Sequence, residues 1–438
     1  MEKEQDVTRR DFLKTAAAAA AVSALPRVGA PAILAAPVVT NPVRYGFIGT
    51  GSRGMELLTA LTTIPQGHCV ATCDIYPVNL KKGVETIGGN PKTYVNYKEL
   101  LERKDIDAVL IATPLYLHAQ MLIDSLDAGK HVFVEKSMFF KEEETEPIRR
   151  AAAAHPKQVL QVGLQRRSSV LYRIAMHMIG KGALGNLTFV RAQWHRNNNW
   201  RRPVADPALE RQINWRMYRA YSGGLMAELG SHQIDVTNWA LGAEPISVVG
   251  TGGINHWKDG RETDDNVQAI FEYPGGQKLL YSSILCNAHY DFNEQIMGDG
   301  GTLVITIGKG MYYREQVAKV STVAAKENWW AGATVSKRAL EQGVLIYPDQ
   351  ENADNGFVDR EFRYAKHWLA SMGIYDYEEP HDPNWSELSN FFASIRDGRP
   401  VAAPLEVGIA DALAVIYANR AIDTGQKVLW PKKEVLVS

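Results

Sequence analysis

The stretch VRYGFIGTGSRG, Val43 to Gly54, decides the fold class of this chain. Its first part, Val43 to Ile48, is an apolar run that ends at a glycine, and the spacing GxGxxG follows directly. The run predicts a buried strand, and Met55 to Leu61 has the composition of a helix. A glycine turn between a strand and a helix predicts the first β–α unit of a dinucleotide-binding domain.

The three glycines have different tasks in such a turn. Gly49 permits the tight bend, Gly51 lets a phosphate approach the backbone, and Gly54 lets the helix pack closely on the strand. The unpaired N–H groups at the helix start attract phosphates. We therefore expect the cofactor to contact Gly49, Gly51, Ser52, Arg53 and Gly54. The alternative is a plain strand–turn–helix connection.

Asp74 selects between the two nicotinamide dinucleotides. It lies twenty residues after Gly54, at the end of a second predicted strand, His68 to Cys73. A carboxylate at this place accepts hydrogen bonds from the ribose hydroxyls and repels a 2′-phosphate. No arginine follows it in CDIYPVNL, which favours NAD over NADP.

Strand and helix patterns alternate along the next part of the chain. The further predicted strands are Ala108 to Ala112, His131 to Val134 and Gln158 to Gly163. The predicted helices between them are Leu115 to Gly129, with a glycine stop, and Glu142 to His155. This alternation predicts an α/β Rossmann domain with a doubly wound parallel sheet over residues 43–165.

After Gly163 the pattern changes to alternating or β-rich runs with glycine turns. These runs are LTFVRAQWHR (187–196), ISVVGTGGINH (246–256), NVQAIFEYPGGQKLLYSSIL (266–285) and GTLVITIG (301–308). They predict an α+β domain over residues 166–438 with a large, mostly antiparallel sheet.

Two helices are expected near the end of the chain. The first has Asn384 as N-cap, Glu387 at the third helical position and Gly398 as its stop. The second runs from about Val407 to Thr424, before Gly425. The segment 320–380 has weak periodicity and receives no assignment.

Composition excludes several classes of protein. The chain has 438 residues, which suits two or three domains, and 48 basic residues balance 49 acidic ones. This balance argues against a nucleic-acid or anionic-membrane partner. Cys69 and Cys73 lie about 13 Å apart along one strand, too far for a disulfide. No cysteine or histidine cluster predicts a metal site, so we expect none.

The N-terminus resembles a twin-arginine export signal, with Thr8 to Lys14 reading TRRDFLK. The apolar run that follows, Thr15 to Leu25, is shorter than the ~20 residues that span a bilayer, and no cysteine follows for a lipid anchor. We expect a signal peptide over residues 1–36, a linker over 37–42, the twin-arginine translocase as a partner during export, and a periplasmic location. The alternative is a disordered or helical tail.

Three further segments, taken together with the glycine turn, resemble the sequence motifs of a known enzyme family. IATPLYLHAQ (111–120), AGKHVFVEKSM (128–138) and GGLMAELGSHQIDVTNWALG (223–242), together with the glycine turn, resemble the Gfo/Idh/MocA family of sugar and polyol oxidoreductases. The resemblance covers nearly the whole mature chain. It implies a Rossmann domain followed by a domain with a large antiparallel sheet, and a homodimer or homotetramer packed through the open sheet face.

The resemblance gives Glu135 and Lys136 a place beside the nicotinamide. The family motif is E-K-P, and here Ser137 replaces the proline that often forms a cis peptide. Partial burial and nearby positive charge lower the pKa of a lysine, which then can take a proton from a substrate hydroxyl. The alternative for Lys136 is a surface lysine paired with Glu135.

The motif GSHQID supplies the second catalytic candidate. His232 and Asp235 are three residues apart, which places them on one face of a helix. The resemblance implies that His232 is an acid or base and that Asp235 binds or supports the substrate; the alternative is a structural histidine. It also implies further positions along the nicotinamide, which are Thr113, Pro114, His118 and Gln165.

Two segments rich in Trp, Tyr, Asn and Arg suggest how a sugar is bound. They are WHRNNNWRRP (194–203) and NWRMYRAYSGG (214–224). Aromatic rings stack on the C–H faces of sugars and polar groups bind the hydroxyls. The candidates are Trp194 and Trp200 for stacking, and His195, Arg196 and Asn197 for hydroxyl binding. An oligomer interface has the same composition and is the alternative.

Three functions follow from these residues. The first is an NAD-dependent oxidoreductase that oxidises a ring hydroxyl of a sugar or glycoside at C3, a glycoside 3-dehydrogenase. The second is a redox-neutral glycosidase that uses bound NAD, as in N-acetylgalactosaminidases of the same superfamily. The third is a non-enzymatic sugar-binding or nucleotide-sensing module. Retention of Glu135 and Lys136 favours the first. Because the periplasm offers no pool of free NAD, we expect the cofactor to be tightly bound.

Overall fold

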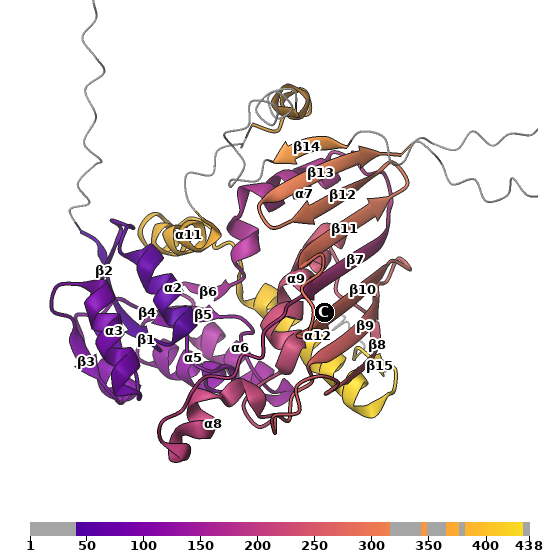
Figure 1. The fold of residues 1–438 in the computed structure, drawn as a ribbon. Helices are drawn as coiled ribbons and strands as arrows, with labels where there is room; N and C mark the ends of the chain where they lie inside the picture. Colours follow the sequence, from indigo (N-terminus) through magenta and orange to yellow (C-terminus); the bar gives the residue numbers. More distant parts are fainter. Residues whose placement is uncertain (1–40, 316–342, 348–364, 376–381, 432–438) are drawn as a thin grey trace, which may run out of the picture. The chain divides into compact units, whose positions relative to one another are not determined.

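The computed structural model describes residues 41–315, 343–347, 365–375 and 382–431 (Figure 1). The predicted signal peptide and most of the unassigned segment 320–380 lie outside these ranges. The described residues belong to one compact unit, which contains a six-stranded and a nine-stranded sheet.

The six-stranded sheet is parallel throughout and has the order β3-β2-β1-β4-β5-β6. Its strands are β1 (Val43–Ile48), β2 (Gly67–Cys73), β3 (Lys92–Tyr94), β4 (Ala108–Ile111), β5 (His131–Glu135) and β6 (Leu160–Gly163). The predicted doubly wound sheet is thus confirmed. The strand order reverses between β1 and β4, and ligands bind at the carboxyl ends of strands at such a point.

Helices connect these strands. They are α2 (Ser52–Leu61), α3 (Pro77–Ile87), α4 (Tyr97–Leu101), η2 (Leu115–Leu117), α5 (His118–Asp127), η3 (Glu142–Glu144) and α6 (Thr145–Ala154). The predicted stop at Gly129 is confirmed, because this residue has φ of 75°. Elements α3, β3 and α4 were not predicted. Helix α3 buries only Gly83 and β3 is three residues long, so neither has a marked apolar pattern.

One face of the parallel sheet is completed by a helix from the far end of the chain. Tyr45 and Phe47 of β1 pack with Leu57 of α2 and with Phe391 and Phe392 of α11 (Pro383–Asp397). The ring centroids of Tyr45 and Phe392 lie 5.5 Å apart. The chain therefore returns to the parallel sheet after it has formed the second sheet.

The predicted start of α11 is wrong. Asp382, not Asn384, is the N-cap, and its side chain accepts a hydrogen bond from the Trp385 N–H at 3.0 Å. Pro383 occupies the first turn, where its missing N–H is no loss. Glu387 is therefore a buried residue further along the helix rather than a capping residue. The predicted end is confirmed, because Gly398 has φ of 68°.

The nine-stranded sheet has the order β14-β13-β12-β11-β7-β10-β9-β8-β15. Its strands are β7 (Leu187–His195), β8 (Ser247–Gly253), β9 (Asn266–Glu272), β10 (Lys278–Ile284), β11 (Phe292–Gly298), β12 (Gly301–Thr306), β13 (Lys309–Arg314), β14 (Val344–Tyr347) and β15 (Val428–Leu429). Strands β7 and β10 are parallel, and the other neighbours are antiparallel. The predicted mostly antiparallel sheet is confirmed.

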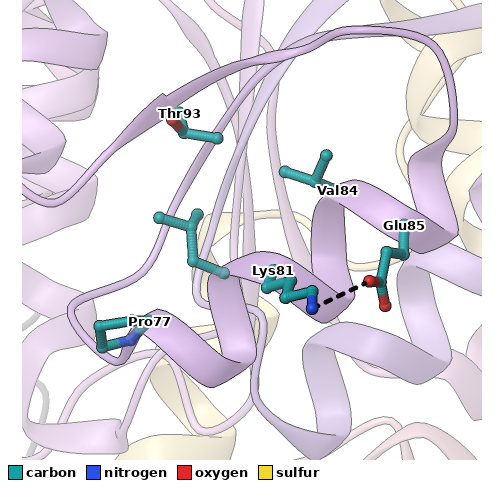
Figure 2. A pocket seen from close by; sticks show the side chains of 6 residues that line it. Pro77, Lys81, Val84, Glu85 and Thr93 are labelled. Atoms are coloured by element: carbon teal, nitrogen blue, oxygen red, sulfur yellow. Dashed lines mark ion pairs between the residues drawn. The ribbon is translucent and has the colours of Figure 1, made fainter.

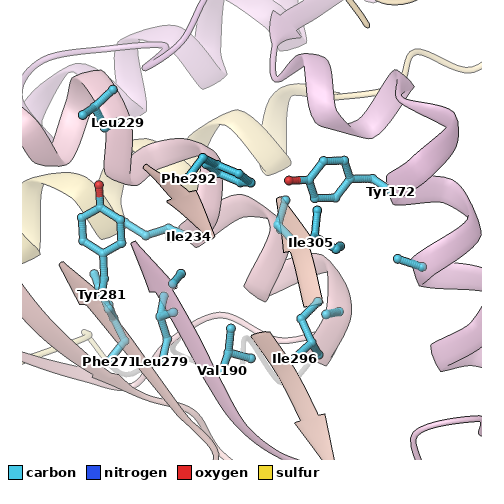
Figure 3. Packing of buried hydrophobic residues seen from close by; sticks show 14 of the residues in the cluster. Tyr172, Val190, Leu229, Ile234, Phe271, Leu279, Tyr281, Phe292, Ile296 and Ile305 are labelled. Atoms are coloured by element: carbon cyan, nitrogen blue, oxygen red, sulfur yellow. The ribbon is translucent and has the colours of Figure 1, made fainter. Parts of the chain in front are cut away.

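Helices cover one face of this sheet. They are α7 (Val170–Gly180), α9 (Ser231–Leu241) and α12 (Leu405–Thr424), which ends at Gly425 as predicted. Figure 3 shows part of the core between the helices and the sheet, where Phe271, Leu279 and Ile296 from different strands point toward the same layer. Shorter helices connect these elements, namely η4 (Gln165–Ser168), η5 (Pro207–Leu209), α8 (Glu210–Ile213), η6 (Trp215–Met217) and the π-helical turn η7 (Met226–Gly230).

The three cysteines are free, which agrees with the prediction that Cys69 and Cys73 form no disulfide. Among the described residues, no helix combines the length and the apolar character needed to cross a membrane.

Candidate functional site

The turn between β1 and α2 is built as its glycines predict. Gly49 has φ of 95°, and a Cβ on it would lie 2.7 Å from the Ala112 carbonyl oxygen. A Cβ on Gly54 would collide with the Gly49 carbonyl oxygen. At Gly51, in contrast, a Cβ would meet no heavy atom within 4 Å. The middle glycine therefore opens space at the start of α2, which fits a diphosphate group.

Asp74 is fixed at the end of β2 by this turn. Its Oδ2 accepts hydrogen bonds from the Thr50 N–H at 2.8 Å and the Thr50 hydroxyl at 3.1 Å, and its Oδ1 accepts one from the Tyr76 N–H at 2.8 Å. Carboxylate oxygens can accept further bonds, so the group can still bind a ribose. The side chain of Ile75 is 56% exposed directly beside it.

Arg53 forms one cluster with two other predicted cofactor residues, Glu135 and Gln165. Its Nε donates to Glu135 Oε1 at 2.8 Å and its Nη2 to Gln165 Oε1 at 2.8 Å. Glu387 of α11 lies 3.5 Å from Nη2. Burial, followed by the charge of Glu135, raises the pKa of Glu387 well above its ordinary value. These side chains pair with one another, and a direct contact of each with the cofactor stays a prediction.

Lys136 lies where the two sheets meet. Its Nζ donates to the carbonyl oxygens of Ala227 at 2.9 Å and Glu228 at 2.8 Å, both in the π-helical turn η7. The Lys136–Ser137 peptide is cis. Burial lowers the pKa of Lys136, whereas the carboxylate of Glu228 acts to raise it. The lysine thus links the motif after β5 to the segment that precedes α9.

His118 lies beneath this motif. Its Nδ1 is 2.8 Å from the Ser137 carbonyl oxygen and its Nε2 is 2.9 Å from the Thr113 carbonyl oxygen. The side chain is 2% exposed. The chain itself thus engages both ring nitrogens, and the geometry gives His118 the role of joining the loops after β4 and β5. Thr113 and Pro114 lie in the first of these loops, beside Gly49.

His232 stands in the first turn of α9 as a neighbour of Lys136. It is 9% exposed, and its Nδ1 is enclosed without a hydrogen-bond partner among the described residues. Burial, together with the positive charges of Lys136 and Arg166, holds the pKa of His232 well below its ordinary value. The imidazole is therefore neutral near pH 7.

Asp235 is held by an arginine. Arg167 Nε lies 2.9 Å from each carboxylate oxygen of Asp235, and Nη2 lies 2.7 Å from Oδ1. The carboxylate is 2% exposed and the guanidinium 13%. Two roles were expected for Asp235, namely substrate binding and support of the site. Because the carboxylate is already held in a bidentate ion pair, the second role fits the geometry better.

The alternation of side chains along β7 places the substrate candidates on two different faces of the sheet. Trp194 faces the core layer, where its ring lies 5.7 Å from the His232 ring, and Arg196 stacks on Trp194 with its guanidinium carbon 4.8 Å from the ring centre. His195 points to the opposite face and contacts the Ser282 hydroxyl at 2.9 Å. The structure therefore does not bring His195 to His232.

The remaining two candidates follow β7. Asn197 is exposed, and its backbone forms an isolated bridge with Cys286. Trp200 has φ of 59° and packs partly buried against the core of the nine-stranded sheet. No contact of either residue with His232 or Lys136 is seen among the described residues.

Sequence reasoning missed several buried or half-buried charges around the site. They are Arg166, Glu228, Glu294, Glu387 and Asp411. Asp411 of α12 accepts a hydrogen bond from the Ser137 hydroxyl at 3.4 Å, and its Oδ1 has no partner among the described residues. Its acidic side chain inside the apolar stretch GIADALAVI was a usable signal, because charged residues are rarely buried without a reason.

A shallow pocket lies elsewhere, on the outer edge of the parallel sheet. Figure 2 shows its lining between α3 and β3, which consists of Pro77, Leu80, Lys81, Val84, Glu85 and Thr93. None of the predicted site residues belongs to this lining. Within the described ranges, no group of three or more His, Cys, Asp and Glu side chains is arranged to hold a metal ion.

Three family models match the chain. They are the oxidoreductase family, NAD-binding Rossmann fold, over residues 43–164; the GFO/IDH/MocA C-terminal domain over residues 172–304; and the twin-arginine translocation pathway signal sequence over residues 6–26. The first model covers the six-stranded sheet, the second covers the nine-stranded sheet from β7 into β12, and the third covers the segment that carries Arg9 and Arg10.

Individual proteins are also similar in sequence to this chain. A glycosyl hydrolase family 109 protein of Shewanella sp. is 31% identical over 241 residues, 49% of this chain and 50% of that protein. An inositol 2-dehydrogenase of Saccharopolyspora erythraea is 26% identical over 60% of this chain and 72% of that protein. The first of these matches spans only about half of its relative's length.

Solved structures share the fold. The myo-inositol 2-dehydrogenase of Lactobacillus plantarum superposes with a TM-score of 0.65 at 19% identity, over 89% of this chain and all of that one. At this identity the likeness concerns the fold, in which a parallel Rossmann sheet is followed by a large, mostly antiparallel sheet.

Proposed function

Because this chain belongs to the Gfo/Idh/MocA oxidoreductase family, we propose that it transfers hydride between NAD and a ring hydroxyl or keto group of a sugar or glycoside. One observation carries the proposal: Lys136 Nζ, after β5, is held by the carbonyl groups of Ala227 and Glu228, just before His232. The proposed base of the first domain is thus anchored to the segment that leads into α9, which carries His232 in the second domain.

The residues around the glycine turn fit NAD. The diphosphate would lie at the free N–H groups of α2, where Gly51 leaves open space. The Asp74 carboxylate would bind the ribose, and Ile75 offers an apolar surface beside it. When bound, the nicotinamide supplies the hydride acceptor. We propose NAD rather than NADP because of the negative charge of Asp74.

Lys136 is the proposed general base. A neutral amine has two N–H groups and one lone pair, and the two N–H groups are taken up by the two carbonyl oxygens of η7. The lone pair then remains for the proton of a substrate hydroxyl. We assign the part of second proton carrier to His232 in the first turn of α9, where the Arg167–Asp235 ion pair holds the same helix.

The test begins with the protein as it is exported. It should be purified without added cofactor, analysed by mass spectrometry for bound nicotinamide, and incubated with a panel of disaccharides and glycosides. The expected product is a keto sugar, with C3 as the proposed position, together with reduced cofactor. Lys136→Ala should abolish turnover and keep the fold, and Lys157→Ala, a change of an exposed lysine, is the matched control. Absence of both nicotinamide and turnover would refute the proposal.

A redox-neutral glycosidase is the second candidate, and the family 109 relative is the observation that favours it. Such an enzyme returns the hydride within each turnover. Released monosaccharide with the cofactor in its starting state would therefore establish the second function, whereas a stable keto sugar establishes the first. The motif Glu135–Lys136 is our reason to rank the dehydrogenase first.

The match to the twin-arginine signal indicates export. We propose the periplasm as the place of action, the twin-arginine translocase as a transient partner, and tight retention of NAD in the pocket. We further propose a homodimer or homotetramer in solution, which size-exclusion chromatography with light scattering will test.

A further inference from the structure

Positive charge gathers around Trp194 in the candidate substrate region. The guanidinium carbons of Arg166 and Arg196 lie 5.2 and 4.8 Å from the centre of the Trp194 ring. The ring of His232 lies 5.7 Å from the same indole. Two arginines thus stand one aromatic ring away from the proposed acid–base residue.

The two arginines differ in how their charges are balanced. Arg166 Nη1 donates to Glu294 Oε1 at 3.0 Å, and the Tyr172 hydroxyl donates to Glu294 Oε2 at 2.8 Å. Burial raises the pKa of Glu294 to about 7, so that its charge offsets Arg166 only in part near neutral pH. For Arg196, the described residues include no carboxylate within ion-pair distance.

The other acidic groups near the site are already engaged. Glu228 pairs with Arg216 at 2.7 Å, and Asp235 pairs with Arg167 at 2.7 Å. Burial, followed by the charge of Asp235, raises the pKa of Asp411 well above its ordinary value, which disfavours the charged form of this carboxyl. The charge of Arg196 therefore has no counterion within the described residues around the site.

The cofactor does not account for this charge either. Its diphosphate would lie at the start of α2, on the parallel sheet, where Gly51 leaves space. Arg166 and Arg196 lie over Trp194 at the end of β7, on the nine-stranded sheet. A partly buried guanidinium without a counterion is a favourable site for an anionic ligand, because charge-assisted hydrogen bonds to Arg are strong and bidentate.

Building on the proposed function, we propose that the substrate is an anionic sugar of the uronic acid class, whose carboxylate Arg196 binds beside Trp194. The sugar ring then lies against the indole, and the ring hydroxyl to be oxidised faces His232 and Lys136. Arg166 strengthens the positive potential of this region, with its guanidinium carbon 4.2 Å from the centre of the Phe292 ring.

Binding can be measured without turnover. The full chain with NAD is titrated calorimetrically with matched pairs of methyl glycosides and methyl glycuronides of glucose, galactose and mannose. In at least one pair the glycuronide should bind more than about tenfold tighter than the glycoside. Arg196→Gln should reduce this preference, measured as the ratio of the glycuronide to the glycoside affinity within a pair, by about tenfold. Arg191→Gln removes the same charge from the exposed face of β7 and should change neither ligand.

Several results would overturn the proposal. Equal or tighter binding of every neutral partner would do so, as would failure of all glycuronides to bind. An equal effect of Arg196→Gln and Arg191→Gln on the preference for the glycuronide would show that only the net charge of the protein determines this preference. Tight binding of a glycuronide without turnover would instead refute the proposed function and leave this inference standing. Preferred turnover of neutral glycosides would refute the inference and keep the function.

Discussion

At the scale of single residues, the environment of Lys136 determines how activity depends on pH. Burial lowers the pKa of this lysine, while the Glu228 carboxylate acts in the opposite direction. In the proposed mechanism the neutral amine is the base, so activity is expected above this pKa and should be lost as the pH falls through it. The rising limb of kcat/KM should therefore lie at lower pH than the ordinary titration of a lysine.

Glu228→Gln tests this relation. The change removes a negative charge that favours the ammonium form and leaves the Arg216 charge unpaired, so the pKa of Lys136 should fall further. The midpoint of the rising limb of kcat/KM against pH should move to lower pH, measured against Glu102→Gln, an exposed carboxylate, as control. An unchanged midpoint, or one at higher pH, would mean that Lys136 is not the titrating base.

The Arg167–Asp235 ion pair gives a prediction about stability. Arg167→Leu leaves the Asp235 carboxylate buried at 2% exposure without its partner. Loss of one member of a buried pair costs about 3 kcal/mol or more. Urea unfolding at pH 7 should show this loss, and Asp235→Asn in the same background should recover part of it. If the second change adds a further loss of equal size, the two side chains are not energetically coupled.

At the scale of elements, substitutions at two glycines of the β1–α2 turn should have different effects, one on cofactor binding and the other on stability. A Cβ at Gly51 meets no protein atom, so Gly51→Ala should change the free energy of unfolding by no more than about 0.5 kcal/mol but weaken NAD binding. A Cβ at Gly54 collides with the Gly49 carbonyl, so Gly54→Ala should cost about 1–3 kcal/mol of stability. Denaturant unfolding and NAD calorimetry on both variants distinguish these effects. Equal losses of stability would contradict the assignment.

The elements that sequence reasoning predicted are those with a strong local signal. Strand β1, its glycine turn and helix α12 have clear apolar patterns and glycine stops, and each was placed within a few residues. The start of α11 was misplaced because Asp382 and Asn384 are both good N-caps, and only the packing of Phe391 and Phe392 on β1 fixes the register. Propensity alone cannot separate two caps that lie two residues apart.

Sequence reasoning picked out the candidate-site residues that belong to a local motif. It missed the residues that reach the site from distant segments of the chain. Lys136, His232 and the glycine turn belong to recognisable motifs. Asp411 and Glu387, from α12 and α11, reach the same region only through tertiary packing, and no local pattern assigns them to it. His195 was chosen by composition, but the alternation of β7 turns it to the other face of the sheet.

At the scale of the whole molecule, the export signal and the cofactor site impose a joint requirement. The twin-arginine route carries folded proteins, so NAD can be inserted in the cytoplasm and travel within the pocket. Because the periplasm offers no pool of free NAD, only a chain that retains its cofactor stays active there. The signal that carries Arg9 and Arg10 thus bears on how tightly the turn at Gly51 and Asp74 must hold NAD.

The last prediction follows from this requirement. The wild-type chain, recovered from the periplasmic fraction, should keep stoichiometric NAD through prolonged dialysis, and its thermal midpoint should not depend on added NAD. Arg9→Lys combined with Arg10→Lys should hold the chain in the cytoplasm with the same NAD content, because we propose that the cofactor is acquired before export. Mass spectrometry of both fractions measures this content. Rapid loss of NAD on dialysis, or NAD only in the cytoplasmic form, would show that the cofactor exchanges freely and would refute recycling within the site.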